Sequence, residues 1–189
     1  PVESNALVIA DMDRLSPLRY FYGVEAQDRH VTVTMPDTEQ QCLEMIEGSL
    51  AAGRPTYLAR FLPDIGKQYS LRSTGPLVRL MYRDAPPLSA GDAQGRAINW
   101  QCQPGLVLLS VESCDQPGTT GDQPAQVAPG DVLSFDLYWQ SDRPLSHDAR
   151  ERVALISNTG RRWFATQWRS PVQGMYPTWM WRPGEVVVD

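Results

Sequence analysis

The stretch Ala6-Leu7-Val8-Ile9-Ala10 is short and wholly apolar, and it opens a pattern in which apolar runs alternate with helical periodicity. A strand without polar residues is typical of a parallel sheet that is covered on both faces. Two further strands are predicted over residues 31–35 and 55–62. The first half of the chain therefore predicts a small parallel sheet of the order β-α-β-α-β, with right-handed crossover connections.

Two helices are predicted to connect these strands. The first is expected to begin at Pro17, because Ser16 followed by proline is a common signal for a helix N-terminus. The second is expected to begin after Asp37, with Gln40 three residues later in a pattern similar to a capping box. Gly53 is predicted to end the second helix, because glycine adopts the left-handed conformation that closes many helices.

Beyond Tyr69 the chain reads as short strands separated by turn residues. Gly75-Pro76 divides residues 69–74 from 77–83, and Pro104-Gly105 divides residues 97–103 from 106–113. Further along, residues 131–140 alternate between apolar and polar, while residues 152–157 and 162–169 are predicted to form a hairpin. Such short strands favour an antiparallel β-sandwich of jelly-roll type.

The fold class predicted is therefore α+β, with a parallel α/β lobe followed by an antiparallel, jelly-roll-like β-sandwich. Residues 84–96 contain several glycines and prolines and almost no large apolar side chain, which is typical of a linker. The predicted division is an α/β lobe over residues 1–83, a linker over 84–96 and a β-sandwich over 97–189. The last strands of the sandwich are expected to be missing, since the chain stops within a strand-like run.

Composition excludes several classes of function. The chain has 189 residues and a net charge of -5, so the composition predicts no basic surface for nucleic acid or for anionic lipid. No apolar run reaches the roughly 18–20 residues that a membrane helix requires. No signal-peptide pattern opens the chain and residue 1 is proline, so we expect a segment excised from a longer protein.

Metal binding and cofactors are not indicated by the sequence. His30 and His147 are the only histidines, and Cys42, Cys102 and Cys114 have neither a paired nor a zinc-type spacing. A disulfide between Cys102 and Cys114 and three buried free thiols are both compatible with the sequence.

Asp11 and Asp13 form the most suggestive chemical signal, because they follow an apolar strand. Carboxylates at the carboxyl end of a parallel strand lie where α/β proteins bind ligands. The pair also resembles the nucleophile motif of haloacid-dehalogenase-type phosphotransferases, although Arg14-Leu15 stands where that family has Gly-Thr. The alternatives are a cap of the first helix, a ligand contact, and phosphotransfer.

Aromatic residues are concentrated near the end of the chain. Five of the six tryptophans and nine of the seventeen aromatic residues lie between Phe135 and Trp181. Alternation predicts Trp139 in the core, on one face with Leu133, Phe135 and Leu137. Trp179 and Trp181, two residues apart, are expected to point the same way, so that with Tyr176 they either stack on a sugar ring or pack the open end of the sandwich.

Two sets of short motifs carry a resemblance to a known class of proteins. In the second half they are Pro129-Gly130-Asp131, Leu137-Tyr138-Trp139-Gln140, Gly174-Met175-Tyr176-Pro177-Thr178 and Arg182-Pro183-Gly184-Glu185. In the first half they include Pro17-Leu18-Arg19-Tyr20, Gly53-Arg54-Pro55-Thr56-Tyr57-Leu58-Ala59-Arg60 and Gly75-Pro76-Leu77. Nearly the whole chain resembles the extracytoplasmic C-terminal region of multi-spanning bacterial membrane proteins, similar to GT-C-type glycosyltransferases and transmembrane protein O-mannosyltransferases.

That resemblance implies a non-catalytic accessory module, tethered at the extracytoplasmic face of a bacterial membrane within its parent protein. It carries over no catalytic residue, because such transferases are expected to catalyse from acidic loops near their N-terminus. The partners implied are the rest of the parent protein and a glycan or glycosylated acceptor, and an exposed β edge favours a homodimer. The alternatives are a carbohydrate-binding module that uses Trp179, Trp181 and Tyr176, and a hydrolase or phosphotransferase that uses Asp11 and Asp13.

Overall fold

The computed structural model describes residues 2–113 and 133–189. Its first half contains two α-helices, α1 (Met12–Tyr20) and α2 (Glu39–Ala51), and a π-helical turn (Phe21–Glu25) that continues α1. The first half also contains five strands, which form one sheet: β1 (Leu7–Ala10), β2 (Thr32–Thr34), β3 (Thr56–Ala59), β4 (Tyr69–Thr74) and β5 (Leu77–Tyr82).

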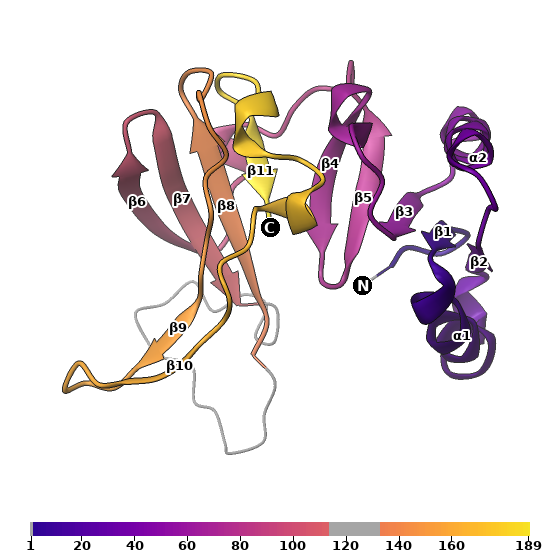
Figure 1. Ribbon diagram of the computed structural model, residues 1–189, viewed down its shortest axis with the longest axis horizontal. Helices are drawn as coiled ribbons and strands as arrows, with labels where there is room; N and C mark the ends of the chain where they lie inside the picture. Colours follow the sequence, from indigo (N-terminus) through magenta and orange to yellow (C-terminus); the bar gives the residue numbers. More distant parts are fainter. Residues whose placement is uncertain (1, 114–132) are drawn as a thin grey trace.

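The five-stranded sheet has the order β2-β1-β3-β5-β4. Strand β1 pairs in parallel with both β2 and β3, which confirms the predicted small parallel sheet with crossover helices. Strand β5 then joins β3 in the antiparallel sense, so the complete sheet is mixed. Helices α1 and α2 pack on opposite faces, and this double cover explains why every residue of β1 and β3 is buried (Figure 1).

Helix α1 begins five residues earlier than predicted. Asp11 is its N-cap, and its Oδ1 atom accepts a hydrogen bond from the backbone N–H of Arg14 at 3.1 Å. Pro17 lies inside the helix rather than at its start, so the expectation based on Ser16 and Pro17 is wrong. A side-chain cap at Asp11 satisfies a free backbone donor, which a proline further along cannot do.

Helix α2 begins one residue later than expected, since its N-cap is Thr38 rather than Asp37. The Thr38 hydroxyl accepts from the backbone N–H of Gln41, while the Gln41 side chain accepts from the backbone N–H of Asp37. This reciprocal arrangement is close to a capping box. At the other end, Gly53 has a positive φ of 67° directly after the helix, as predicted.

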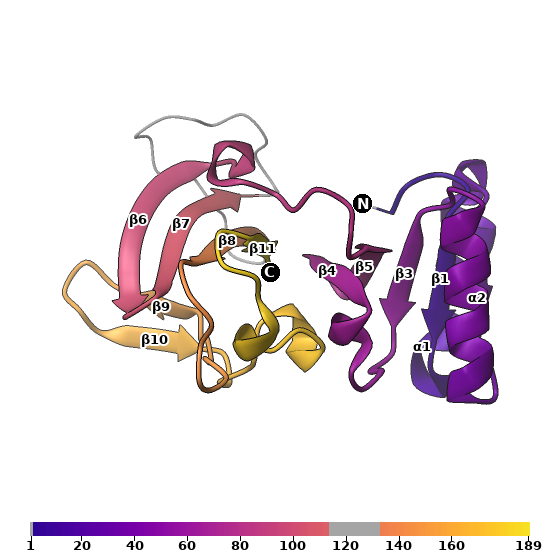
Figure 2. The ribbon, with the colours of Figure 1, turned by 90° about the horizontal axis from the view of Figure 1, so that it is seen from above.

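The second half contains a four-stranded antiparallel sheet and a separate two-stranded hairpin, visible at the other side of the molecule in Figure 2. The sheet order is β11-β8-β7-β6. Its strands are β6 (Arg96–Gln103), β7 (Leu106–Ser113), β8 (Phe135–Ser141) and β11 (Val186–Val188), and the hairpin is β9 (Ala154–Ile156) with β10 (Arg162–Ala165). The jelly-roll arrangement and the division at residues 84–96 stay predictions.

Strand β8 has apolar contacts on both faces, not on the single face that alternation predicted. Trp139 is buried in the main core, which confirms its predicted place. Tyr138 is buried on the opposite face, where Val186 and Val188 of β11 pack against it. Phe135, expected on the core face, is exposed at the start of the strand.

A single core connects the two halves of the molecule. It runs from α2 through the five-stranded sheet to short 3₁₀ turns, η3 (Ile65–Lys67), η5 (Val172–Gly174) and η6 (Thr178–Met180), and on to the four-stranded sheet. Gly66 allows this contact, because a Cβ there would lie 2.7 Å from the Tyr176 ring. Arg182 crosses the same boundary, donating to the backbone carbonyl of Arg83 at 2.7 Å.

Candidate functional site

The predicted tryptophan pair is divided between core and surface. Trp181 is buried and donates from its indole nitrogen to the Tyr176 carbonyl at 2.9 Å, and Tyr176 is itself buried. Trp179 is exposed. The expectation that Trp179 and Trp181 point the same way is wrong, because residues 178–180 form a 3₁₀ turn and period-two alternation applies only to strands. Tyr176 and Trp181 pack the core, whereas stacking on a sugar requires an open ring face.

The two candidate aspartates lie at the start of α1. Asp11 caps the helix, as one of the alternatives predicted, and Asp13 stands in the exposed first turn. Within residues 2–113 and 133–189, no three or more His, Cys, Asp or Glu side chains gather where they could hold a metal ion. Cys42 is buried and Cys102 is exposed, both with free thiols, while Cys114 lies outside the described residues.

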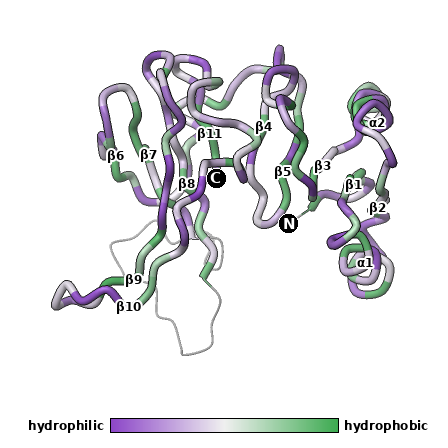
Figure 3. The backbone as a smooth tube through the Cα atoms, in the orientation of Figure 1, coloured by the Kyte–Doolittle hydropathy of each residue, from purple (hydrophilic) through white to green (hydrophobic). Residues whose placement is uncertain are grey.

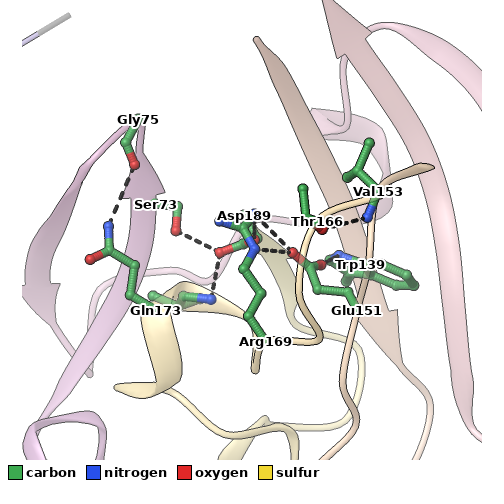
Figure 4. Close-up of polar contacts among 10 residues, drawn as sticks. Ser73, Gly75, Trp139, Glu151, Val153, Thr166, Arg169, Gln173 and Asp189 are labelled. Atoms are coloured by element: carbon green, nitrogen blue, oxygen red, sulfur yellow. Dashed lines mark hydrogen bonds and ion pairs between the residues drawn. The ribbon is translucent and has the colours of Figure 1, made fainter. Parts of the chain in front are cut away.

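A carboxylate cluster that the sequence did not predict lies between the two sheets (Figure 4). Glu151 and Asp189 bind the same Arg169 guanidinium nitrogen, at 2.9 and 2.7 Å. Asp189 also accepts from the Ser73 hydroxyl of β4 at 2.8 Å, and Glu151 accepts from the Trp139 indole nitrogen of β8 at 3.1 Å. The cluster therefore joins β4, β8 and the end of β11 through polar contacts.

Both carboxyl groups of this cluster are buried. Burial raises the pKa of Glu151, the neighbouring Asp189 carboxyl raises it further, and Arg169 opposes the rise. Each carboxyl group has donors from more than one element, so the arrangement fixes position rather than leaving an oxygen free for substrate. We interpret it as a clamp between the two halves of the molecule.

Glu151 also contributes to the wall of an adjacent cavity of about 590 Å³, here called the tryptophan pocket. The pocket lies between the four-stranded sheet and the segments 147–153 and 168–171. Its walls are largely apolar, with polar groups from Gln103, Glu151, Arg152 and the segment around His147. Its tryptophans are Trp100, Trp139, Trp168 and Trp181.

The pairing of strands explains how the pocket acquires its aromatic wall. Trp100 of β6 is opposite Leu108 of β7, which is opposite Trp139 of β8. Side chains in register across neighbouring strands share one face of a sheet, so these three residues form a continuous apolar row. The row is buried at Trp139 and open at Trp100, whose side chain is 62% exposed.

Trp168 lines the pocket from the segment that follows β10. Its side chain is 58% exposed, and the Arg152 guanidinium lies 4.6 Å from the ring centroid. Of the predicted ligand contacts, Trp181 reaches this pocket, where its buried ring belongs to the wall. Sequence reasoning missed Trp100 and Trp168 because they lie on distant segments: the β6–β7–β8 pairing places Trp100 in register with Trp139, and Trp168 is next to Arg169, which pairs with Glu151.

A second cavity of about 760 Å³ lies where β4 and β5 face the start of β8. Its arginines are paired with acidic partners: Arg79 lies 2.6 Å from Glu3, and Arg72 lies 4.0 Å from Asp136. Because its charged groups already satisfy one another, this cavity is a weaker candidate for a ligand than the tryptophan pocket.

Comparison with known proteins adds no further assignment. No family model, curated protein or solved structure matches the chain. Among the described residues, none of the helices combines the length and the hydropathy needed to cross a membrane.

Proposed function

We propose that this chain is a non-catalytic module that binds a glycan in the tryptophan pocket. The observation that carries the proposal is that two exposed indoles, Trp100 and Trp168, line the same mostly apolar cavity of about 590 Å³. The proposal keeps the accessory role expected for an extracytoplasmic module of a membrane glycosyltransferase-like protein, in which the glycan belongs to the acceptor.

The chemistry of the pocket suits a sugar better than a fully apolar ligand. A sugar ring has an apolar face of C–H groups that packs on an indole, and a rim of hydroxyl groups that needs hydrogen-bond partners. The pocket is lined by the indoles of Trp100 and Trp168, with Gln103 and Arg152 among its polar groups. Cavities that combine apolar walls with a few polar groups are the common form of small-ligand sites.

The carboxylate cluster beside the pocket argues for binding rather than hydrolysis. Glycoside hydrolysis requires two carboxyl groups that flank the scissile bond, about 5–10 Å apart depending on the mechanism. Glu151 and Asp189 instead share one Arg169 nitrogen, and Asp189 is almost completely buried. There is no room between them for a sugar, so we assign them a structural role.

Glycan-array binding followed by calorimetric titration tests the proposal. We expect the chain to bind one class of glycan, and Trp168→Ala to weaken that binding at least about tenfold. Trp163→Ala is the matched control, because Trp163 is also an exposed tryptophan, in strand β10 of the hairpin, but does not contribute to the pocket. Absence of binding to every glycan, or equal losses in both variants, would contradict the proposal.

A further inference from the structure

The β9–β10 hairpin projects from the body of the molecule and exposes large apolar side chains. Figures 1 and 2 both show it extending beyond the four-stranded sheet, and in Figure 3 strand β9 is hydrophobic next to a hydrophilic turn. Trp163 is 69% exposed and Phe164 is 61% exposed, and Leu155 and Ile156 of β9 are also more than half exposed. Apolar exposure gathered in one arm indicates a contact surface.

Pairing places two of these side chains together on one face of the hairpin. Leu155 is directly opposite Phe164, and the register shifts between Arg162 and Phe164, where Trp163 is the additional residue. A bulge of this kind twists the strands and redirects the side chain of the extra residue. The bulge therefore adds an indole beside a phenyl group and an aliphatic side chain near the turn.

The hairpin is also basic, although the molecule is acidic. Residues 150–169 contain five arginines and one glutamate, a net charge of +4, whereas the whole chain carries -5. The glutamate is Glu151, which is buried in the carboxylate cluster, while Arg161 and Arg162 are exposed beside the turn. The charges that this arm presents to solvent are therefore all positive.

The base of the hairpin is fixed to the body. Backbone hydrogen bonds join Glu151 and Arg169 in both directions, at 2.8 and 3.0 Å, and their side chains form the ion pair of the carboxylate cluster. One step toward the turn, Thr166 donates its backbone N–H to the Val153 carbonyl at 2.9 Å. The base of the hairpin thus has a fixed position, and the exposed apolar and cationic side chains lie between the Thr166–Val153 hydrogen bond and the turn.

We propose that the β9–β10 hairpin binds an anionic lipid surface. Trp163, Phe164 and Leu155 would enter the interfacial region, where indole and phenyl groups are favoured, and Arg161 and Arg162 would contact lipid phosphates. A protein partner would also accept apolar side chains. The combination of a projecting arm, aromatic groups and exclusively cationic exposed charge favours a bilayer, because a net negative protein needs a local basic surface to approach it.

This inference is independent of the glycan proposal. Trp163, Phe164 and Leu155 do not line the tryptophan pocket, and Trp100 is not part of the hairpin. Each surface can therefore be removed while the other stays intact.

Vesicle co-sedimentation tests the inference directly. The chain should sediment with phosphatidylcholine vesicles that contain phosphatidylglycerol, and much less with phosphatidylcholine alone. We expect the double substitution Trp163→Ala/Phe164→Ala to reduce partitioning about tenfold or more. A second double variant, Arg161→Gln/Arg162→Gln, retains the apolar groups and should lose the preference for anionic vesicles and its sensitivity to salt. Trp100→Ala, a pocket substitution on another strand, serves as the control and should bind vesicles like the wild type.

Three results would overturn the inference. The first is absence of binding to anionic vesicles by the wild-type chain. The second is binding that both double variants retain. The third is a dimer, measured by sedimentation velocity, that Trp163→Ala/Phe164→Ala dissolves while vesicles are not bound, since the hairpin would then contact a second copy. Because the arginine variant leaves every apolar contact intact, misfolding of the aromatic variant would not remove the test.

Discussion

The two sheets of this molecule use their apolar residues in opposite ways. In the five-stranded sheet every residue of β1 and β3 is buried, whereas β6 in the four-stranded sheet exposes seven of its eight residues. The hairpin next to that sheet exposes four large apolar side chains. The strands β1 and β3 of the first half are therefore buried, whereas β6 and the hairpin of the second half leave large aromatic side chains exposed. Matched substitutions in the two kinds of environment can test this difference.

Trp181 and Trp179 provide the largest contrast. Trp181→Ala removes a buried indole and its hydrogen bond to Tyr176, so it should destabilise the fold by about 4 kcal/mol. Trp179→Ala should cost roughly 1 kcal/mol or less, because that ring is 46% exposed. Urea denaturation of both variants measures the two costs. Equal losses of stability would contradict the placement of Trp181 in the core and of Trp179 at the surface.

The cost of removing an isoleucine side chain is expected to differ between the five-stranded sheet and the hairpin. Ile9→Ala opens a cavity under α2 and should lower the free energy of unfolding by about 3 kcal/mol. Ile156→Ala in β9 should change it by about 0.5 kcal/mol or less, since the side chain is largely exposed. Thermal and chemical unfolding would both show the contrast. A large cost at Ile156 would mean that the hairpin is packed rather than available for contact.

Arg169 tests the clamp between the halves. Arg169→Met leaves two buried carboxyl groups without their shared cation, and we expect a loss of about 2–3 kcal/mol. Arg143→Met is the control, because the Arg143–Asp142 pair is exposed and should contribute about 0.5 kcal/mol or less. The comparison uses urea unfolding at neutral pH. If the two arginines prove equivalent, the cluster is not a clamp.

The pH dependence of stability has a defined sign. Burial and the Asp189 carboxyl raise the pKa of Glu151 from 4.5 to about 8 in the folded chain. Between those values the folded chain retains a proton that the unfolded chain has released, so this group stabilises the fold fully below pH 4.5 and progressively less as the pH rises. The slope is at most about 1.4 kcal/mol per pH unit.

Glu151→Gln removes that titration and provides its control. The wild-type chain should lose stability relative to the variant as the pH rises from 4.5 to about 8, as measured by unfolding free energies at several pH values. Parallel curves for the two proteins would mean that Glu151 does not hold a proton in the fold.

The first sheet could be predicted from local patterns, and the second only in part. Apolar runs and the turns at Gly75-Pro76 and Pro104-Gly105 locate strands, because each signal lies within a few residues. The first residue of α1 was harder to predict, because Asp11 and Pro17 are both signals for a helix start. The side-chain hydrogen bond of Asp11 decides between them. The period-two alternation of a strand gave the wrong orientation for Trp179 and Trp181, because residues 178–180 form a 3₁₀ turn, which has about three residues per turn.

The candidate site could not be predicted because it depends on contacts between distant residues. Trp100 meets Trp139 only through Leu108 and the register of three strands. Glu151 and Asp189 meet through Arg169, on segments with no common sequence signal. Bulges in the β6–β7 and β7–β8 pairings shift that register, and a local pattern does not specify where they occur.

Glycan binding in the tryptophan pocket is tested by titrating the array-selected glycan against the wild-type chain and the Trp100→Ala/Trp168→Ala double variant, with melting temperatures recorded for both. We expect the double variant to lose affinity by well over about tenfold. Its melting temperature should stay close to that of the wild type, because both side chains are more than half exposed. Unchanged affinity in a folded double variant would contradict the proposal, as would a wild-type chain that binds no glycan.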